Sequence, residues 1–221
     1  MRFEILVEGQ SELTALSILM KQILGEYGIP HRWRIHKHQG IGQIPTNPEL
    51  SPNRNDRTLL HNLPAKLKAY GNEDDHDLLV VVLVDLDDRQ NCVEFKNQLL
   101  SLLSFCDKKP QVLFRIAIEE LEAWYLGDAN ALKQAYPLGL HEKLVNYVQD
   151  SQSGTWEMLA EIIHPGGLNE LLIKGKRSPL VREEKVKWAK TISLHMNVEQ
   201  NLSPSFCCFR DGLRRIVNSE I

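Results

Sequence analysis

The segment LLVVVLVDLD, residues 78–87, is the strongest indication of the fold. Its first seven residues are all Val or Leu. A continuous apolar run of this kind is typical of a strand that is buried on both faces of a parallel sheet. The run ends in Asp85 and Asp87, with Leu86 between them and facing the core. Because α/β sheets bind ligands beside the carboxyl ends of their strands, the stretch predicts a central strand and part of a functional site.

Strand and helix patterns alternate on both sides of this stretch. Further strands are predicted at residues 2–8, 31–38 and 111–118, and helices from Ser11 onward, at 57–70 and at 89–104. This β-α-β-α-β-α-β order is typical of an α/β fold with a parallel sheet of about four strands wrapped by helices. We therefore expect one α/β domain over residues 1–126.

The strand pattern fades after this point. Short helices are predicted at residues 129–136, 141–149, 155–163, 179–190 and 204–218. Ser178-Pro179 and Ser203-Pro204 each predict a capped helix start with Pro at the first helical position. Residues 127–221 are therefore expected to form a C-terminal α-helical extension that packs on the α/β domain.

The composition is that of an ordinary soluble protein, with 43% hydrophobic and 25% charged residues and a net charge of −3. No global positive charge indicates a nucleic-acid-binding protein. No stretch approaches the roughly 20 apolar residues of a membrane span, and the N-terminus runs directly into a strand pattern. The four cysteines have no CxxC spacing. We therefore expect a cytoplasmic protein with reduced thiols and no membrane segment.

A second acidic motif, Glu8-Gly9, closes the apolar run of the first strand. Carboxylates that converge at one sheet edge repel one another unless a cation lies between them. Mg²⁺ prefers such oxygen ligands. Simpler explanations exist for the neighbouring acids, because Glu12 can complement the helix dipole and Asp88 can cap the following helix. Glu8 itself can be a solvated strand end.

These motifs carry a resemblance to a known family. Glu8-Gly9 and Asp85-Leu86-Asp87, in this order, resemble the Toprim domain of topoisomerases, primases and OLD-type nucleases over about residues 1–125. The segments LVEGQSE (6–12), IEELEAW (118–124) and NLSPSF (201–206) resemble a bacterial Toprim-like family of unknown function, domain of unknown function 4276, over nearly the whole chain. The resemblance implies a Toprim-like fold related to that of OLD-type nucleases.

The resemblance also implies roles for single residues. The implied catalytic residues are Glu8, Asp85, Asp87, Glu119 and Glu122, and the implied ligands of Mg²⁺ (or Mn²⁺) are Glu8, Asp85, Asp87 and Glu122. Glu119 and Glu122 would share one helical face at i and i+3, and Glu120 is expected to face solvent. Lys174 or Lys176 would supply the lysine that often accompanies such sites.

Two basic segments are weaker candidates for nucleic-acid contact. Arg32 and Arg34 alternate along one face of a predicted strand, and Lys174, Lys176 and Arg177 form a basic loop. Both segments are predicted either to face phosphates or simply to be solvated.

The leading hypothesis is a Mg²⁺-dependent Toprim-type nuclease that hydrolyses phosphodiesters of DNA or RNA, since a bound metal can activate water and stabilise the leaving oxygen. No GxxxxGK[ST] motif is present, which predicts an ATPase partner protein. Family analogy adds a role in defence against phage. One alternative is a non-catalytic regulatory or scaffold subunit with an acidic metal-binding pocket. Another is a phosphohydrolase, in which Thr or Val would be expected directly after Asp87, where this chain has Asp88. The oligomeric state is not predicted.

Overall fold

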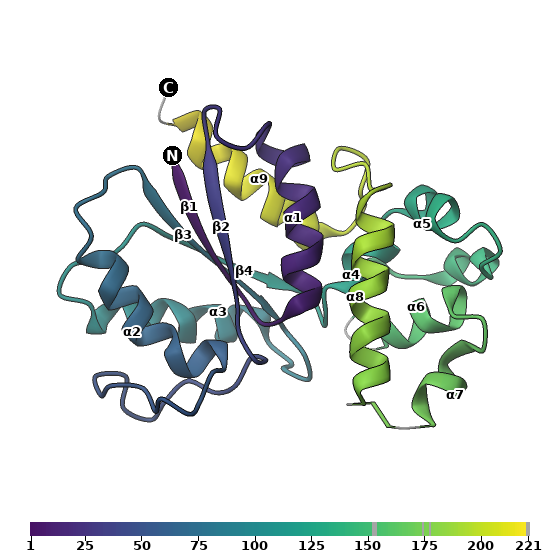
Figure 1. The fold of residues 1–221 in the computed structure, drawn as a ribbon, viewed down its shortest axis with the longest axis horizontal. Coiled ribbons are helices and arrows are strands. Elements are labelled where there is room, and N and C mark those ends of the chain that lie inside the picture. The colour runs from purple at the N-terminus through teal and green to yellow at the C-terminus, as the bar shows by residue number, and fades with distance from the viewer. Residues whose placement is uncertain (152–153, 174, 177, 220–221) are drawn as a thin grey trace.

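The computed structural model describes residues 1–151, 154–173, 175–176 and 178–219. Its centre is a four-stranded parallel sheet of order β2-β1-β3-β4 (Figure 1), formed by β1 (Arg2–Val7), β2 (Arg32–Lys37), β3 (Leu78–Asp85) and β4 (Val112–Ala117). Ile5 of β1 is the register partner of both Ile35 and Val81, and Val84 of β3 is the partner of Ile116. The predicted α/β fold is confirmed, and all carboxyl ends meet at one edge.

Helices cover both faces of the sheet (Figure 1). The helix α1 (Gln10–Leu24) packs on one face, and α2 (Leu59–Gly71) and α3 (Cys92–Ser101, continued by η1, Leu102–Phe105) pack on the other. Alternate residues of β3 enter the two apolar clusters: Leu79, Val81 and Leu83 on the α1 side, and Val80, Val82 and Val84 on the α2 side. This two-sided burial explains why β3 is apolar throughout.

Two helix starts differ from the prediction. Gly9, and not Ser11, is the N-cap residue of α1, while the Ser11 hydroxyl donates to Glu12 Oε1 at 2.8 Å. Asn91, and not Asp88, caps α3, because its side chain accepts two backbone hydrogen bonds of 3.0 Å from the first turn. Glu8 therefore lies in the short connection between β1 and α1, and Asp87 and Asp88 lie in the turn between β3 and α3.

The C-terminal part is helical, as predicted. After the short helix α4 (Glu122–Leu126), its helices are α5 (Ala129–Ala135), η2 (His141–Asn146), α6 (Thr155–Ile163), α7 (Gly167–Leu172), α8 (Pro179–Ser193) and α9 (Pro204–Ser219). The long helix α8 packs along α1, and α9 returns to α1 and β4 (Figure 1). The predicted division between residues 126 and 127 stays a prediction. Among the described residues, no helix combines the length and apolar character that a membrane span requires.

Polar contacts join the two later segments of the family resemblance, residues 118–124 and 201–206. Asn201 Nδ2 donates to the backbone oxygen of Trp124 at 2.7 Å. The Trp124 indole in turn donates to Ser205 Oγ at 3.0 Å. All three residues are buried. These two segments therefore connect the start of α9 to the end of the α/β domain.

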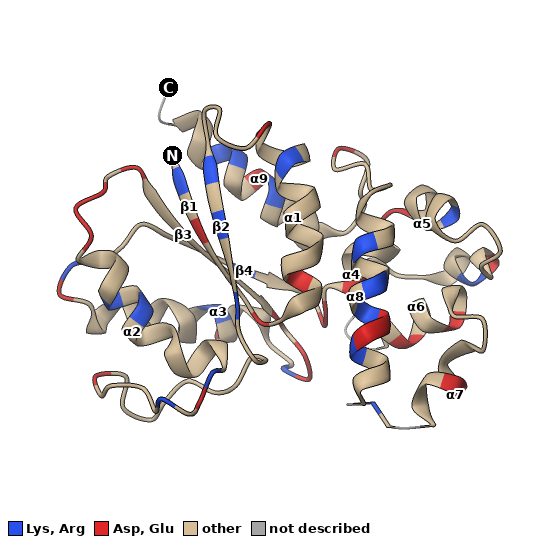
Figure 2. Cartoon of the chain, viewed as in Figure 1, with Lys and Arg blue, Asp and Glu red and all other residues tan. Residues whose placement is uncertain are grey.

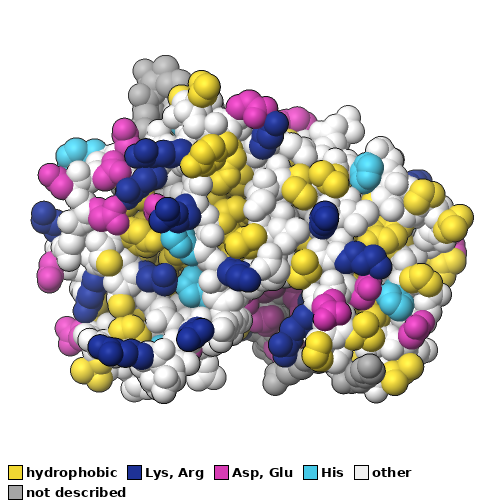
Figure 3. All heavy atoms as spheres, in the orientation of Figure 1, with side chains coloured by type: hydrophobic (Ala, Val, Ile, Leu, Met, Phe, Trp, Pro, Cys, Tyr) yellow, Lys and Arg dark blue, Asp and Glu magenta, His cyan; other side chains and the backbone are white. Residues whose placement is uncertain are grey.

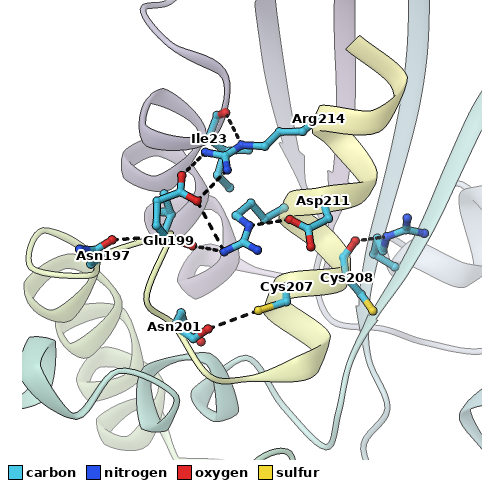
Figure 4. Close-up of polar contacts among 11 residues, drawn as sticks. Ile23, Asn197, Glu199, Asn201, Cys207, Cys208, Asp211 and Arg214 are labelled. Carbon is cyan, nitrogen blue, oxygen red and sulfur yellow. Dashed lines mark hydrogen bonds and ion pairs between the residues drawn. The ribbon is translucent and has the colours of Figure 1, made fainter. Parts of the chain in front are cut away.

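A second contact fixes the other end of α9. Arg214 Nε donates to the backbone oxygen of Ile23 in α1 at 3.2 Å, and Arg214 NH1 contacts Glu199 Oε2 at 3.0 Å (Figure 4). Arg214 thus joins α9 to α1 and to the α8–α9 connection.

Candidate functional site

Acidic residues follow three adjacent strands of the sheet. Glu8 comes directly after β1, Asp85 ends β3, and the segment 119–122 follows β4. In the sheet order, β1 lies next to β3 and β3 next to β4. These residues therefore gather at one edge, where α/β folds bind ligands.

Glu8 and Asp85 are linked directly. Glu8 Oε1 accepts a hydrogen bond of 2.7 Å from the backbone N–H of Asp85. Burial raises the pKa of Glu8 well above its usual value, although this hydrogen bond opposes the shift. Burial, and then the charges of Glu8 and Glu12, raise the pKa of Asp85 well above its usual value. Asp85 Oδ1 is buried without a hydrogen-bond partner. The environment of this pair therefore disfavours the charged form of both carboxylates.

Three further carboxylates and one lysine complete the site, which we call the carboxylate cluster: Glu8, Glu12, Asp85, Glu120, Glu122 and Lys185. Lys185 Nζ lies 2.5 Å from Glu120 Oε2 and 3.5 Å from Glu122 Oε2. Glu12 and Glu122 are buried, with 6% and 2% of their surface exposed. Lys185 comes from α8, which packs against α1 (Figure 2). The cluster therefore combines both parts of the chain.

The raised pKa values of the cluster's carboxyl groups are caused first by burial and then by the charges of neighbouring carboxylates. Burial and the nearby charge of Glu122 raise the pKa of Glu120 to about 8, against the opposing effect of Lys185. Burial also raises the pKa of Glu12. For Lys185, burial disfavours the charged form, but Glu122 and Glu120 outweigh it and raise its pKa. One ammonium group thus faces a set of carboxyl groups in a buried environment that disfavours the charged form of Glu12 and Glu120.

A hard divalent cation fits the chemistry of this donor set. The donors are all carboxylate oxygens, which Mg²⁺ and Mn²⁺ prefer, and the unpartnered Asp85 Oδ1 is a buried oxygen free to coordinate. Among the described residues, however, no three His, Cys, Asp or Glu side chains are already arranged as a metal site.

Asp87 lies at the rim of the cluster. Its backbone adopts a left-handed conformation with φ of 49°, and its carboxylate lies 3.4 Å from Arg89 NH1. Burial raises the pKa of Asp87, while Arg89 lowers it. Asp87 is close enough that its charge also raises the pKa of Glu8. As predicted, Leu86 between the two aspartates is buried in the core.

Glu119 and Glu120 both differ from the positions expected for them. The Glu119 carboxylate accepts hydrogen bonds from the backbone N–H groups of Gly154, at 2.5 Å, and Thr155, at 2.6 Å, at the start of α6. Glu119 has φ of 59° and precedes α4, which begins at Glu122. The expected helical i, i+3 face with Glu122 is therefore wrong. Glu120, expected to face solvent, instead contacts Lys185.

Of the basic residues predicted to contact nucleic acid, Lys176 lies near the cluster, because its Nζ and that of Lys185 lie 5.7 Å and 5.5 Å from the centre of the same Trp156 ring. Arg32 and Arg34 are exposed on the edge strand β2. Lys176 pairs with Glu157 at 2.6 Å and does not supply the lysine of the cluster. Lys174 and Arg177 lie outside the described residues. A nucleic-acid contact by any of these five stays a prediction.

The sequence contained a signal for two residues that the prediction missed. Glu12 occupies the first position of the buried stripe of α1, four residues before Leu16. Lys185 lies between Val181 and Trp188 on the buried stripe of α8. A charged residue on an otherwise apolar helical stripe is costly to bury without a partner. Such positions therefore indicate a buried polar site.

Fold and site together define an α/β protein with a carboxylate cluster at the carboxyl ends of three adjacent parallel strands. Residues 7–214 match the family described as "Domain of unknown function (DUF4276)". The chain belongs to this family, as the sequence resemblance predicted.

The structure is similar to the C-terminal region of the Burkholderia pseudomallei OLD protein. The TM-score is 0.50 at 17% sequence identity, and the match covers 98% of this chain and 98% of the other. At that identity the likeness shows a shared fold. No curated protein matches the sequence. The predicted fold of an OLD-type protein is thus found in the structure, and the predicted relation to Toprim domains stays a prediction.

Proposed function

We propose that the protein is a metal-dependent Toprim-type nuclease that hydrolyses phosphodiester bonds of DNA or RNA. The observation that carries this proposal is the carboxylate cluster, in which Asp85 Oδ1 is buried without a partner and burial raises the pKa of Glu8, Asp85 and Glu120. Strongly shifted pKa values in one place are typical of functional sites. The fold shared with the OLD protein region supports the same class.

The residues that would hold Mg²⁺ or Mn²⁺ are Glu8, Asp85, Asp87 and Glu122, with Glu12 and Glu120 as additional donors. A bound divalent ion supplies Lewis-acid activation of the phosphate and a lower pKa for water. Glu119 has a structural role in this proposal, because both of its carboxylate oxygens accept backbone hydrogen bonds at α6.

Two side chains contribute chemistry of their own. Lys185 Nζ is held at the cluster by Glu120 and Glu122, where its charge can stabilise negative charge on a phosphate. Glu8 is oriented by its hydrogen bond to the backbone of Asp85. Its raised pKa, caused mainly by burial, lets the carboxyl hold a proton at a higher pH than a free glutamate. That property is required of a general acid or base near neutral pH.

The biological setting that we propose is a cytoplasmic defence effector that works with an ATPase partner. The chain has a net charge of −3 and no phosphate-binding ATPase motif. A partner would then supply ATP hydrolysis and additional grip on the nucleic acid.

The test is cleavage of supercoiled DNA, single-stranded DNA and RNA in Mg²⁺ or Mn²⁺. Glu8→Gln and Asp85→Asn should abolish cleavage, whereas Asp88→Asn, at an exposed position next to the site, should cleave like the wild type. Cleavage that survives both cluster substitutions would refute the proposal.

A non-catalytic regulatory or scaffold subunit is the second candidate. One observation favours it: Lys185 already lies between two carboxylates of the cluster as an internal counter-ion. Inactive wild-type protein that nevertheless binds Mn²⁺ through Asp85 would support this second function.

A further inference from the structure

A basic pocket lies beside the carboxylate cluster, on the other side of β1. It has a volume of about 450 Å³ and opens between the carboxyl end of β2, the following loop and α2. The residues that matter for its chemistry are Lys37, His38, Arg54, Asp56, Arg57 and Lys66. Figure 3 shows Lys, Arg and His side chains gathered on this part of the surface, and acidic side chains in the hollow next to it.

The charge of the pocket is the opposite of that of the whole chain. Four Lys or Arg side chains line it, with Asp56 as the single carboxylate. Asp56 Oδ1 accepts hydrogen bonds from the backbone N–H of Thr58, at 2.9 Å, and from its hydroxyl, at 2.6 Å. Lys37 contacts an uncharged partner, Gln10 Oε1, at 2.5 Å. Within the described part of the chain, none of the four cations forms an ion pair.

The loop that carries Arg54 and Arg57 is held in place by its own hydrogen bonds. The backbone N–H of Gln39 donates to the backbone oxygen of Arg57 at 3.0 Å and so closes the loop at its ends. Asn62 Nδ2, from α2, donates to the backbone oxygen of Asp56 at 2.8 Å. Both arginines are exposed. The loop therefore presents free guanidinium groups from a fixed backbone, which lowers the cost of binding an anion.

The pocket is joined directly to the strand end that carries Glu8. The backbone N–H of His38 and its Nδ1 lie 3.1 Å and 2.8 Å from the backbone oxygen of Val7. The next carbonyl, that of Glu8, accepts from the N–H of Gly40 at 2.9 Å. Lys37 is the register partner of Val7, and neighbouring strands lie about 4.8 Å apart. The basic pocket and the carboxylate cluster thus lie next to each other along the carboxyl edge of the sheet.

We propose that this basic pocket binds a backbone phosphate of the same nucleic-acid strand whose scissile phosphate lies at the carboxylate cluster. The inference rests on the proposed nuclease function and adds the substrate contact that the cluster lacks. Phosphate contacts by Lys and Arg fix the register of a strand without reading its sequence. Several cations spread over one open pocket suit a polyanion better than a single small anion. Lys66 adds support, because burial lowers its pKa and a bound phosphate would offset that effect.

The test is binding of a labelled single-stranded oligonucleotide, measured by fluorescence anisotropy in EDTA so that no cleavage occurs. The double variant Arg54→Gln/Arg57→Gln should bind at least about tenfold more weakly, and its affinity should depend less steeply on salt, by about one unit of slope per lost contact. The matched control is Arg215→Gln, at an exposed arginine of α9 outside the pocket. Lys66→Gln should weaken binding in the same direction. Circular dichroism of each variant verifies folding.

Two outcomes would overturn the inference. One is equal affinity of the pocket double variant and the control variant. The other is a pocket that binds inorganic phosphate or a mononucleotide without any competition from the oligonucleotide. In that case the double variant would lose small-anion binding and keep its affinity for the strand.

The nuclease proposal fails separately from this inference. Glu8→Gln should keep strand binding in EDTA while cleavage in Mg²⁺ is lost. A wild type that binds the strand through the pocket and never cleaves it would refute the nuclease and leave the binding site intact.

Discussion

Replacing Lys185 with methionine should destabilise the metal-free protein, because the substitution removes the single ammonium group of the carboxylate cluster. Lys185 Nζ lies 2.5 Å from Glu120 and 3.5 Å from Glu122. Deleting one partner of a buried ion pair costs about 3–5 kcal/mol. The side chains of Lys185 and Glu120 are each 21% exposed, so we take the lower end, about 3 kcal/mol. In a chain of 221 residues this corresponds to a fall in Tm of about 6–12 °C.

The effect should depend on pH in a defined direction. Burial raises the pKa of Glu120 to about 8 in the folded protein, from an ordinary value of 4.5. Between these two values the folded state holds a proton that the unfolded state has released, so stability falls as the pH rises through this window. Below pH 8 Lys185 faces a largely protonated Glu120, and above it an ionised one. The loss caused by Lys185→Met should therefore be larger at pH 9 than at pH 6.

The assay is thermal unfolding in EDTA at both pH values, followed by circular dichroism. Lys187→Met is the matched control on the same helix, because Lys187 is exposed and contacts Glu184 at 3.4 Å. An exposed pair of this kind contributes about 0–1 kcal/mol. Equal falls in Tm for the two variants, or an effect of Lys185→Met that is the same at pH 6 and pH 9, would contradict a buried counter-ion role for Lys185.

Three further predictions concern single contacts. Mn²⁺ should raise the Tm of the wild type at pH 8, because metal ions replace protons on the carboxyl groups whose pKa is raised. Asp85→Asn should remove this rise in Tm. An unchanged Tm of the wild type in Mn²⁺ would contradict metal binding at the cluster. Glu119→Ala should cost about 1–2 kcal/mol of stability through the lost cap of α6, yet leave Mn²⁺ binding intact by calorimetry; loss of binding would restore Glu119 to the metal site. Asn201→Ala should destabilise by about 1–3 kcal/mol, because the buried carbonyl of Trp124 loses its donor, with urea unfolding as the measurement and Asn197→Ala as the comparison.

The sheet could be predicted because its cause is local. The run of Val and Leu in β3 is buried on both faces, and that composition is typical of a central parallel strand. The alternation with helices then fixed the parallel arrangement, since parallel strands need crossover connections. Glu8 and Asp85 followed from the same pattern, as strand-end carboxylates at one edge.

The helix starts were predicted less well for a physical reason. Asn91 and Asp88 are both good N-cap residues, and the length of the turn after β3 decides between them. That turn depends on Asp87, which adopts a left-handed conformation and bonds through its backbone N–H to the oxygen of Glu119 at 2.8 Å. The contact joins two segments far apart in the sequence.

The fold class and the two acidic strand ends can be read from local sequence patterns. The other carboxylates and the lysine that join them depend on long-range packing. Glu119 turns to α6 while Glu120 meets Lys185, which is 65 residues away in the chain. Charges at buried positions are set by the elements that face them, and α8 reaches the strand ends only through its packing on α1. Local pattern governs the sheet, whereas long-range packing completes the site.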